Sequence, residues 1–456
     1  MLILLKNFRI VDETTDSPGS VFIEDGFIRG LSGPDARPEG AALVLDGGAP
    51  LSGGARLVLM PAFVDLHAHF RDPGASGQGG PGSESGLPAE CIESACLAAA
   101  AGGYGTVVCM ANTRPPVDSY EKAAALKSRS DALGLIDLFP VLSLTRNMEG
   151  KDISVLTKLP TARKNTGFIR LLSEDGRDVS DDGLFFAALT EAGRAGIPVS
   201  CHCDLGGEEA AVRRAIGLAA RAGARIHIAH VSTGETADLI RNKKTEMNHT
   251  LSCEATPHHL ALTEGDAAAL GRESFGKVSP PLRSEEDRLA VIEALIDGTI
   301  DAIATDHAPH TRSGKEGGAP GFSGLETAFA VCYSTLTAPR VRESGSNPPR
   351  ENRTPGGNRK SGISLSKLSS LMSAAPARIL GLDGGTDGLG GRGRIAPGYR
   401  ADICVADLSV SRIVESENFM SRGKNSPFVG RNMRGGIVLT IHGGRVVYDR
   451  LFAGAP

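Results

Sequence analysis

The sequence predicts an α/β protein: a (β/α)8 TIM barrel with a small β-sandwich domain that the N- and C-terminal segments form together. Three observations support this fold. Apolar runs typical of buried strands alternate with helix-like segments eight times through the middle of the chain. Both ends of the chain instead carry short strand-like runs. The 456 residues exceed one ordinary domain, but a barrel of about 250 residues can take most of them.

The two ends of the chain are predicted to build the small domain. The N-terminal strands cover residues 2–10, 21–31 (broken at Asp25-Gly26), 42–46 and 57–60, and residues 47–56 form a glycine-rich loop. Near the other end, helix-like segments at 364–375 and 377–381 precede strands at 401–407, 437–442 and 445–448. We therefore expect residues 1–60 and 386–456 to form one β domain, with the barrel inserted as residues 61–385. Two independent small domains are the alternative.

The barrel region is predicted from its alternation of strands and helices. The strands are expected at 64–69, 105–110, 136–142, 167–173, 197–202, 224–230, 250–254 and 299–305. The helices between them are expected at 89–101, 119–133, 182–195, 208–222, 234–241 and 284–297. Glycines directly after Ala101 and Ala222 fit helix C-caps.

Three polar stretches do not match packed structure. Residues 75–87, 343–362 and 311–321 are of low complexity and are expected to be loops. The last of them follows Asp306-His307-Ala308-Pro309-His310 directly, so we expect it to be a lid.

Composition excludes several classes of protein. Apolar residues make up 41% of the chain, tryptophan is absent and aromatic residues amount to 4%, so the core must be aliphatic. A formal charge of -4 gives no sign of a nucleic-acid or membrane partner. Lys6 interrupts the apolar start too early for a signal peptide, and no apolar run approaches the ~20 residues of a membrane span. The eight scattered cysteines predict buried thiols, no disulfide framework and a cytoplasmic location.

One stretch, residues 61–74 (PAFVDLHAHFRDPG), carries the first chemical signal. On a strand, side chains two positions apart share a face, so Asp65, His67, His69 and Arg71 are expected to point the same way. Two imidazoles on a rigid strand can chelate a metal ion, and a guanidinium beyond them can hold a carboxylate. Alone, the motif fits two hydrogen-bonded histidines on a barrel wall equally well.

The remaining strand ends decide between these interpretations. Barrel enzymes place reactive residues at the C-terminal ends of strands, and here those positions hold Asn112, Glu174, Asp175, His202, His230, Asp306, His307 and His310. With His307 and His310 set aside, the rim holds four histidines (His67, His69, His202 and His230) and two carboxylates, Asp306 and one from Glu174-Asp175. This set suits two divalent ions such as zinc, with a bridging carboxylate such as Asp175 and a bridging hydroxide. Asp306 is then expected to be both ligand and proton shuttle, with a pure ligand as the alternative.

Other histidines are predicted to have structural roles. His227 lies three residues before His230, so on a regular strand it faces the other way. His258 and His259 follow the seventh strand, where capping or packing is favoured over a role behind the ligands. For Asp65, packing and ligand support both remain open.

The stretch 61–74 resembles the signature of the dihydroorotases of the amidohydrolase superfamily, specifically the type I bacterial enzymes. Similar motifs recur along nearly the whole chain: residues 102–104, 110–113, 228–233, 254–260, 280–283, 297–310, 324–327 and 421–428. The resemblance implies two divalent metal ions, with Zn²⁺ expected, held by His67, His69, Asp175, His202, His230 and Asp306. It implies that Asp306 is the catalytic acid/base and that Arg71, Asn112, Ser279 and His310 bind substrate.

The resemblance also implies a reaction and partners. The reaction is the reversible hydrolysis of (S)-dihydroorotate to N-carbamoyl-L-aspartate in de novo pyrimidine biosynthesis. The partners are this small-molecule substrate and either a second copy of the chain or aspartate carbamoyltransferase. The alternatives are another cyclic amidase (dihydropyrimidinase- or allantoinase-like) and a non-catalytic partner of aspartate carbamoyltransferase, which would lose metal ligands.

Two features favour dihydroorotase over the other cyclic amidases. Those relatives bridge their metals with a carboxylated lysine, whereas the fourth predicted strand here has none, and they usually lack an arginine at the position of Arg71. The chain also departs from the dihydroorotase pattern. Ser279 replaces a usual asparagine, and Glu174 precedes Asp175 where two aspartates are usual, so Glu174 is the alternative bridge. Pro320-Gly321-Phe322 replaces the usual Pro-Phe-Gly.

Overall fold

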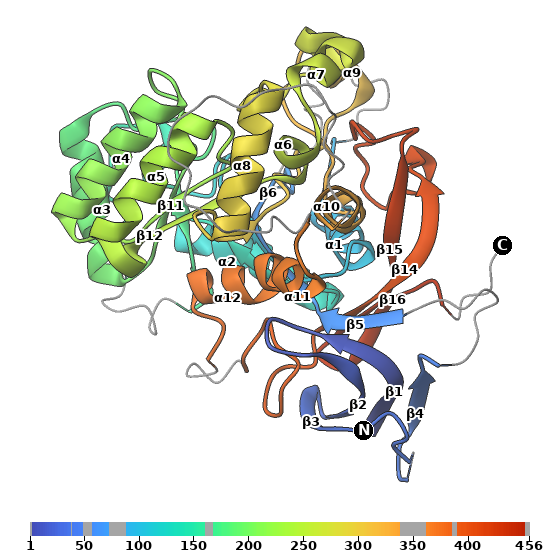
Figure 1. Cartoon of the computed structure of the whole chain (residues 1–456). Helices are drawn as coiled ribbons and strands as arrows, with labels where there is room; N and C mark the ends of the chain where they lie inside the picture. Colours follow the sequence, from blue (N-terminus) through green and yellow to red (C-terminus); the bar gives the residue numbers. More distant parts are fainter. Residues whose placement is uncertain are drawn as a thin grey trace, which may run out of the picture.

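The computed structural model describes residues 2–37, 39–48, 57–72, 88–159, 167–337, 362–384 and 390–451. The predicted loop at 75–87, nearly all of the one at 343–362 and most of the glycine-rich loop at 47–56 lie outside these ranges. Within the described residues, the expected alternation of strands and helices is present (Figure 1).

A closed barrel of eight parallel strands forms the centre of the molecule. Its strands are β6 (Phe63–Ala68), β7 (Tyr104–Cys109), β8 (Asp137–Pro140), β9 (Leu172–Ser173), β10 (Val199–Cys201), β11 (Ile226–Ile228), β12 (Leu251–Ala255) and β13 (Ala302–Ile303). Single parallel bridges, Leu142 with Leu172 and Ala68 with His307, join β8 to β9 and the end of β13 to β6. The predicted (β/α)8 fold is thus confirmed, although the fourth strand is much shorter than the predicted 167–173.

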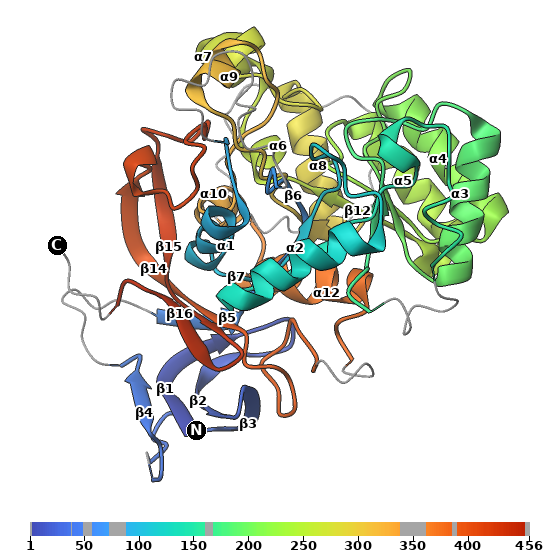
Figure 2. The ribbon, with the colours of Figure 1, turned by 180° about the vertical axis from the view of Figure 1, so that it is seen from behind.

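Helices surround the barrel (Figures 1 and 2). Those between the barrel strands are α1 (Ile92–Ala101), α2 (Tyr120–Leu133), α3 (Asp182–Ala195), α4 (Glu208–Ala222), α5 (Gly234–Met247), α6 (Pro257–Ala261), α7 (Glu264–Leu270) and α8 (Glu285–Asp297). Those after the barrel are α9 (Arg312–Glu316), α10 (Ala328–Leu336), α11 (Leu365–Ser369) and α12 (Ala375–Leu380), the last two joined by a π-helical turn, Ser370–Ala374. Side chains of Ser119, Asp181 and Ser284 cap α2, α3 and α8, which fixes their starts where the sequence predicts them.

Strands from both ends of the chain form one mixed sheet. They are β1 (Leu2–Val11), β2 (Asp16–Glu24), β3 (Phe27–Ser32), β4 (Leu43–Asp46), β5 (Leu57–Pro61), β14 (Ile403–Ile413), β15 (Asn432–His442) and β16 (Arg445–Asp449). β5 pairs with N-terminal β1 on one side and with C-terminal β14 on the other. This pairing confirms the shared small β domain and excludes two independent ones. Aliphatic side chains from both ends of the chain share one core beneath this sheet.

The small domain is joined to the barrel by buried charges and by packing. Arg392 forms ion pairs with Asp137 at the start of β8 and with Asp402. Arg400 and His442 complete the cluster around Asp402. β15 also packs against α10 and α1 (Figure 2). No helix among the described residues has the length and apolar character needed to cross a membrane.

Candidate metal centre

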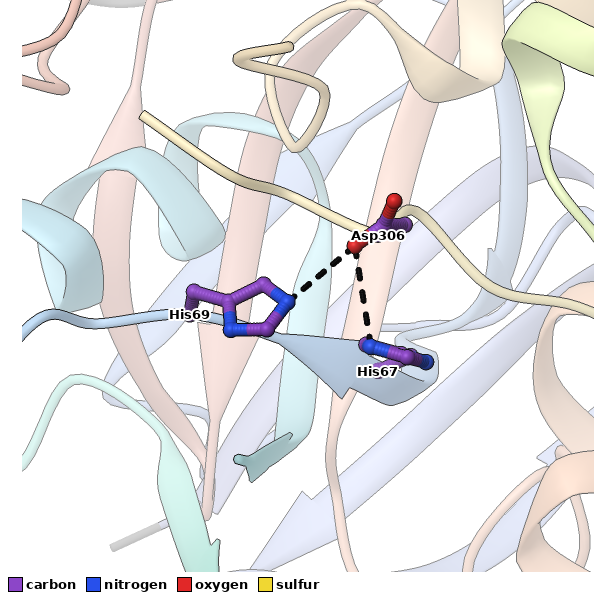
Figure 3. Close-up of side chains that lie close together, drawn as sticks. All are labelled: His67, His69 and Asp306. Atoms are coloured by element: carbon purple, nitrogen blue, oxygen red, sulfur yellow. Dashed lines mark hydrogen bonds and ion pairs between the residues drawn. The ribbon is translucent and has the colours of Figure 1, made fainter. Parts of the chain in front are cut away.

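The histidines of the first barrel strand face a carboxylate that follows the last strand. His67 lies on β6 and His69 just beyond it, and Figure 3 shows both side chains directed toward Asp306. The Nε2 atoms of His69 and His67 lie 3.2 Å and 3.6 Å from Asp306 Oδ1. All three side chains are buried. Burial opposes the charge on Asp306, yet the neighbouring imidazoles hold the pKa of its carboxyl below the ordinary value.

Asp175 brings a second carboxylate to the same histidines. Its Oδ1 lies 3.2 Å from His67 Nε2 and its Oδ2 lies 3.6 Å from His69 Nε2. Asn112 connects the two sides, because its Nδ2 donates to Asp175 Oδ2 (2.8 Å) while its Oδ1 lies 2.9 Å from His69 Nδ1. The neighbouring Glu174 instead accepts hydrogen bonds from the backbone of Leu144 and Thr145. This geometry favours Asp175 over Glu174 as the carboxylate that faces both His67 and His69.

His230 lies beside His67, and His202 lies beside His230. The His230 ring centroid lies 5.3 Å from that of His67 and 4.6 Å from that of His202. His230 is buried, and burial lowers its pKa well below the ordinary value, so the imidazole is neutral. Within the described part of the chain, neither ring nitrogen of His230 has a hydrogen-bond partner. A buried imidazole with two unsatisfied nitrogens is costly unless a ligand completes it.

These residues fit a pair of divalent metal ions. Among the described residues, the donor atoms of five of them fall into two overlapping groups within 4.8 Å, His67 with His69 and Asp306, and His67 with Asp175 and His230. His202, the sixth predicted ligand, is in neither group and contacts His230. Neutral imidazoles and carboxylates form the donor set that zinc and similar ions prefer. Arg71, His230 and Asp306 also have positive φ angles of 55°, 34° and 45°, which residues other than glycine seldom adopt outside functional sites.

A layer of residues behind the cluster was not predicted from the sequence. Glu254 Oε1, at the end of β12, lies 3.3 Å from His67 Nδ1, and Glu254 Oε2 lies 3.0 Å from His227 Nε2. His227 was expected to face away from His230, but that argument fails because β11 ends at Ile228 and His230 lies beyond its regular alternation. Glu254 does end a predicted strand, which is the signal that could have identified it.

Asp65 and the paired histidines of α6 have supporting contacts. Asp65 accepts hydrogen bonds from the backbone N–H and the hydroxyl of Thr305, the residue before Asp306, and so ties β6 to the end of β13. His259 bonds with Thr256, the N-cap of α6, and with the Pro280 carbonyl. The His258 ring packs against Phe322. These contacts agree with the expected capping and packing roles.

Arg71 and His310 lie together beside the cluster of histidines and carboxylates. Arg71 Nη2 is 3.3 Å from His310 Nε2, which donates to the Pro320 carbonyl at 2.8 Å. Burial and the Arg71 charge lower the pKa of His310 to about 3, so its imidazole is neutral at physiological pH. Arg71 Nε is buried and has no hydrogen-bond partner among the described residues. Ser279 lines an adjoining cavity of about 400 Å³ with Pro320 and Lys277.

The stretch 311–321 is packed, contrary to the expectation from its composition. It contains α9, which Thr311 caps through a hydrogen bond from the Gly314 N–H. Lys315 on α9 is fully buried, and its Nζ donates to the carbonyls of Lys277, Ala319 and Gly321 at 2.8–3.0 Å. The sequence argument was wrong because a lysine that caps three carbonyls can replace apolar packing.

Replacing Lys315 with methionine should loosen this segment. The three buried carbonyls would lose their donor, so we expect a loss of about 1–3 kcal/mol in the free energy of unfolding. The Michaelis constant should rise as well, since Pro320 and Gly321 adjoin His310. Denaturant unfolding and steady-state kinetics measure both effects. Lys243→Met is the matched control, because its partly exposed ammonium pairs with Glu246 on α5. Unchanged stability and Michaelis constant in Lys315→Met would contradict this role.

Glu326 fixes a segment of the C-terminal region near the site. Its carboxylate accepts from the backbone N–H groups of Met420 (2.7 Å) and Ser421 (3.1 Å). Burial raises the pKa of Glu326 from 4.5 to about 7. Between these values the folded chain binds more protons than the unfolded chain, so the stability from this group is full below pH 4.5 and is lost as the pH rises through about 7.

Glu326→Gln should therefore change how stability depends on pH. The amide keeps an acceptor for the two N–H groups but does not titrate. Relative to the wild type, the variant should gain up to about 3 kcal/mol of unfolding free energy between pH 5 and pH 8. Denaturant titrations at the two pH values measure this difference. An identical difference at both values would show that Glu326 does not titrate in this range.

Comparisons with known proteins agree with this architecture. The model of the amidohydrolase family matches residues 58–447. A protein named dihydroorotase from Clostridium botulinum is 34% identical over 99% of this chain and its own full length. A dihydroorotase from Thermus aquaticus is 35% identical, again over 99% of this chain and all of that protein.

Solved structures share the fold. The L-hydantoinase (dihydropyrimidinase) of Arthrobacter aurescens superposes with a TM-score of 0.76 at 24% identity, covering 98% of this chain and 96% of the other. The dihydropyrimidinase of Brevibacillus agri gives a TM-score of 0.78 at 22% identity, over 98% and 95%. At these identities the likeness establishes the architecture alone.

Proposed function

Because this chain belongs to the amidohydrolase family, and its dihydroorotase relatives match nearly all of it, we propose that it is a dihydroorotase. The reaction is the reversible hydrolysis of (S)-dihydroorotate to N-carbamoyl-L-aspartate, a step of de novo pyrimidine biosynthesis. One observation carries the choice of substrate. The half-buried Arg71 lies beside His310, next to the proposed metal-binding side chains, where a ring that bears a carboxylate would present it.

The residues divide the chemistry between them. Two divalent ions held by His67, His69, Asp175, His202, His230 and Asp306 would make water more acidic and polarise the amide carbonyl. Arg71, Asn112 and His310 hold the substrate carboxylate and so orient the ring. Residues 168–176, which include Asp175, contain no lysine. The resemblance implies a carboxylated lysine as the metal bridge of the relatives that cleave hydantoins or allantoin, so this stretch fits the aspartate-bridged type instead.

Asp306 moves the proton. Water adds through its oxygen to the ring carbonyl carbon, and Asp306 takes the proton that the water releases. Asp306 then gives this proton to the ring nitrogen as the bond between that nitrogen and the carbonyl carbon breaks. The new carboxyl group releases the second proton of the water to solvent, so the products are a carboxylate and a ureido nitrogen on one open chain. The reverse reaction uses the same residue in the opposite order.

The test is a steady-state assay of the purified protein in both directions, with metal analysis of the same sample. We expect hydrolysis of dihydroorotate and cyclisation of carbamoyl-aspartate, both lost after chelation and restored by zinc. Dihydrouracil, hydantoin and allantoin form the comparison panel, because the solved neighbours are hydantoinases and dihydropyrimidinases. Turnover of a panel member without turnover of dihydroorotate would reverse the choice, and a metal-free, inactive chain would favour the non-catalytic partner.

The remaining predictions follow from this function. Zinc is the expected metal, because imidazoles and carboxylates make up the whole donor set. All eight cysteines are buried and free of disulfides, which supports a reducing cytoplasmic location. A homodimer or an association with aspartate carbamoyltransferase stays a prediction that sedimentation of the purified chain, alone and with that enzyme, would test.

A further inference from the structure

We propose that Asn425, a residue of the small β domain, positions the substrate-carboxylate pocket of the barrel by holding His310 and the backbone at Gly321. The inference rests on the proposed function, because it concerns the pocket assigned to the substrate carboxylate. Asn425 lies in the stretch 421–428, which contains none of the residues proposed to bind metal or to transfer the proton. It acts through other residues and is not expected to contact substrate.

The side-chain amide of Asn425 spans the two segments that frame His310. Its Oδ1 accepts the backbone N–H of His310 at 2.8 Å and lies 3.0 Å from the Ser323 hydroxyl oxygen. Its Nδ2 donates to the Gly321 carbonyl at 3.0 Å and lies 3.4 Å from the Ala308 carbonyl. One amide therefore fixes the chain that carries His310 relative to the turn whose Pro320 carbonyl accepts from its imidazole.

Asn425 is itself held in place. Its backbone carbonyl accepts from the Ser323 N–H, and the Ser323 hydroxyl donates to the Gly423 carbonyl at 2.6 Å. A Cβ at Gly423 would lie 2.5 Å from Pro309 Cβ and 2.9 Å from His310 N, so the C-terminal segment lies directly against the loop that carries His310. Earlier in the segment, Glu90 accepts from the Ser421 hydroxyl and forms an ion pair with His307.

This arrangement predicts an effect on substrate binding rather than on the chemical step. Among the described residues, the side chains of the proposed metal site contact one another, whereas the Asn425 amide contacts the backbone at Ala308, His310 and Gly321. His310 would lose the acceptor of its backbone N–H and could move away from Arg71. Because a carboxylate site must be held within about 0.5 Å, Asn425→Ala should raise the Michaelis constant for dihydroorotate about tenfold or more, with kcat within about threefold.

A double-mutant cycle tests whether Asn425 acts through His310. We compare the wild type, Asn425→Ala, His310→Ala and the double variant, with metal content and thermal unfolding measured for each. Asn418→Ala, at an exposed asparagine whose side chain bonds with Glu415, is the matched control. If the inference holds, Asn425→Ala adds nothing to His310→Ala. Additive effects, or an unchanged Michaelis constant in Asn425→Ala, would overturn it.

A second measurement separates this inference from the proposed function. The imidazole signals of the metal-loaded protein are recorded by NMR, and His310 is assigned by its loss in His310→Ala. Asn425→Ala should shift the His310 signals and leave those of His249, on the barrel exterior, unchanged. Unchanged His310 signals would refute the positioning role whatever the substrate. Absence of dihydroorotate turnover in the wild type, together with shifted His310 signals, would refute the proposed function alone.

Discussion

Asp306→Asn should lower kcat for dihydroorotate by about 10³-fold or more while the protein stays folded. General acid–base groups typically contribute 10²–10⁴-fold, and here one carboxylate serves both as base toward water and as acid toward the leaving nitrogen. Asparagine keeps an oxygen at the position 3.2 Å from His69 Nε2 but cannot carry a proton. Metal should therefore remain partly bound, and the loss should fall on kcat more than on the Michaelis constant.

The experiment pairs turnover with metal content. Asp306→Ala removes the oxygen as well and should lose more metal than Asp306→Asn, with a similar or larger loss of turnover. Asp131→Asn, an exposed aspartate on α2 that pairs with Lys127, serves as the control and should behave as the wild type. If Asp306→Asn kept wild-type turnover with metal bound, Asp306 would be a ligand alone and another group would move the proton.

Arg71→Met should change which substrates the site accepts. Truncating one partner of a buried, hydrogen-bonded charge pair costs about 2–5 kcal/mol, so kcat/KM for dihydroorotate should fall by about 10²–10³-fold. Methionine has a similar length but offers no donor to a carboxylate. Rings without a carboxylate, such as dihydrouracil, lose nothing by this change, and their relative rate should rise.

The measurement is the ratio of kcat/KM values for dihydroorotate and dihydrouracil. Arg71→Lys should recover part of the loss, since lysine restores the charge without the two-pronged geometry of a guanidinium. Arg213→Met, on the exposed face of α4, is the control. Equal losses for both substrates would mean that Arg71 supports the structure of the site and does not recognise the carboxylate.

The identity of the barrel was predictable because its signals are local. A buried strand needs only a short apolar run in the sequence, and a helix needs a longer segment that begins with a capping residue. All eight strand positions could therefore be assigned from the sequence. The C-terminal ends of parallel strands meet on one rim, and this rule alone placed His67, Asp175, His230 and Asp306 together. Their proximity in the structure agrees with that prediction, and their roles as ligands and proton shuttle remain to be tested by the variants above.

Other features depend on which partner the fold supplies. Glu174 and Asp175 are adjacent and chemically alike. The backbone N–H groups of Leu144 and Thr145 donate to Glu174, whereas Asp175 faces His67. The composition of 311–321 predicted a loop, because nothing local shows that three carbonyls would surround Lys315.

The stretch 61–74 by itself determined which side chains are presented at strand spacing, namely two imidazoles and a guanidinium. The tertiary structure alone decided what stands opposite each of them. His67 meets Glu254 from β12, and Arg71 meets His310, which Asn425 holds from a segment more than 100 residues away along the chain. The physical reason is that spacing along a strand fixes the direction of a side chain, whereas its partner depends on how strands and loops distant in the sequence pack together.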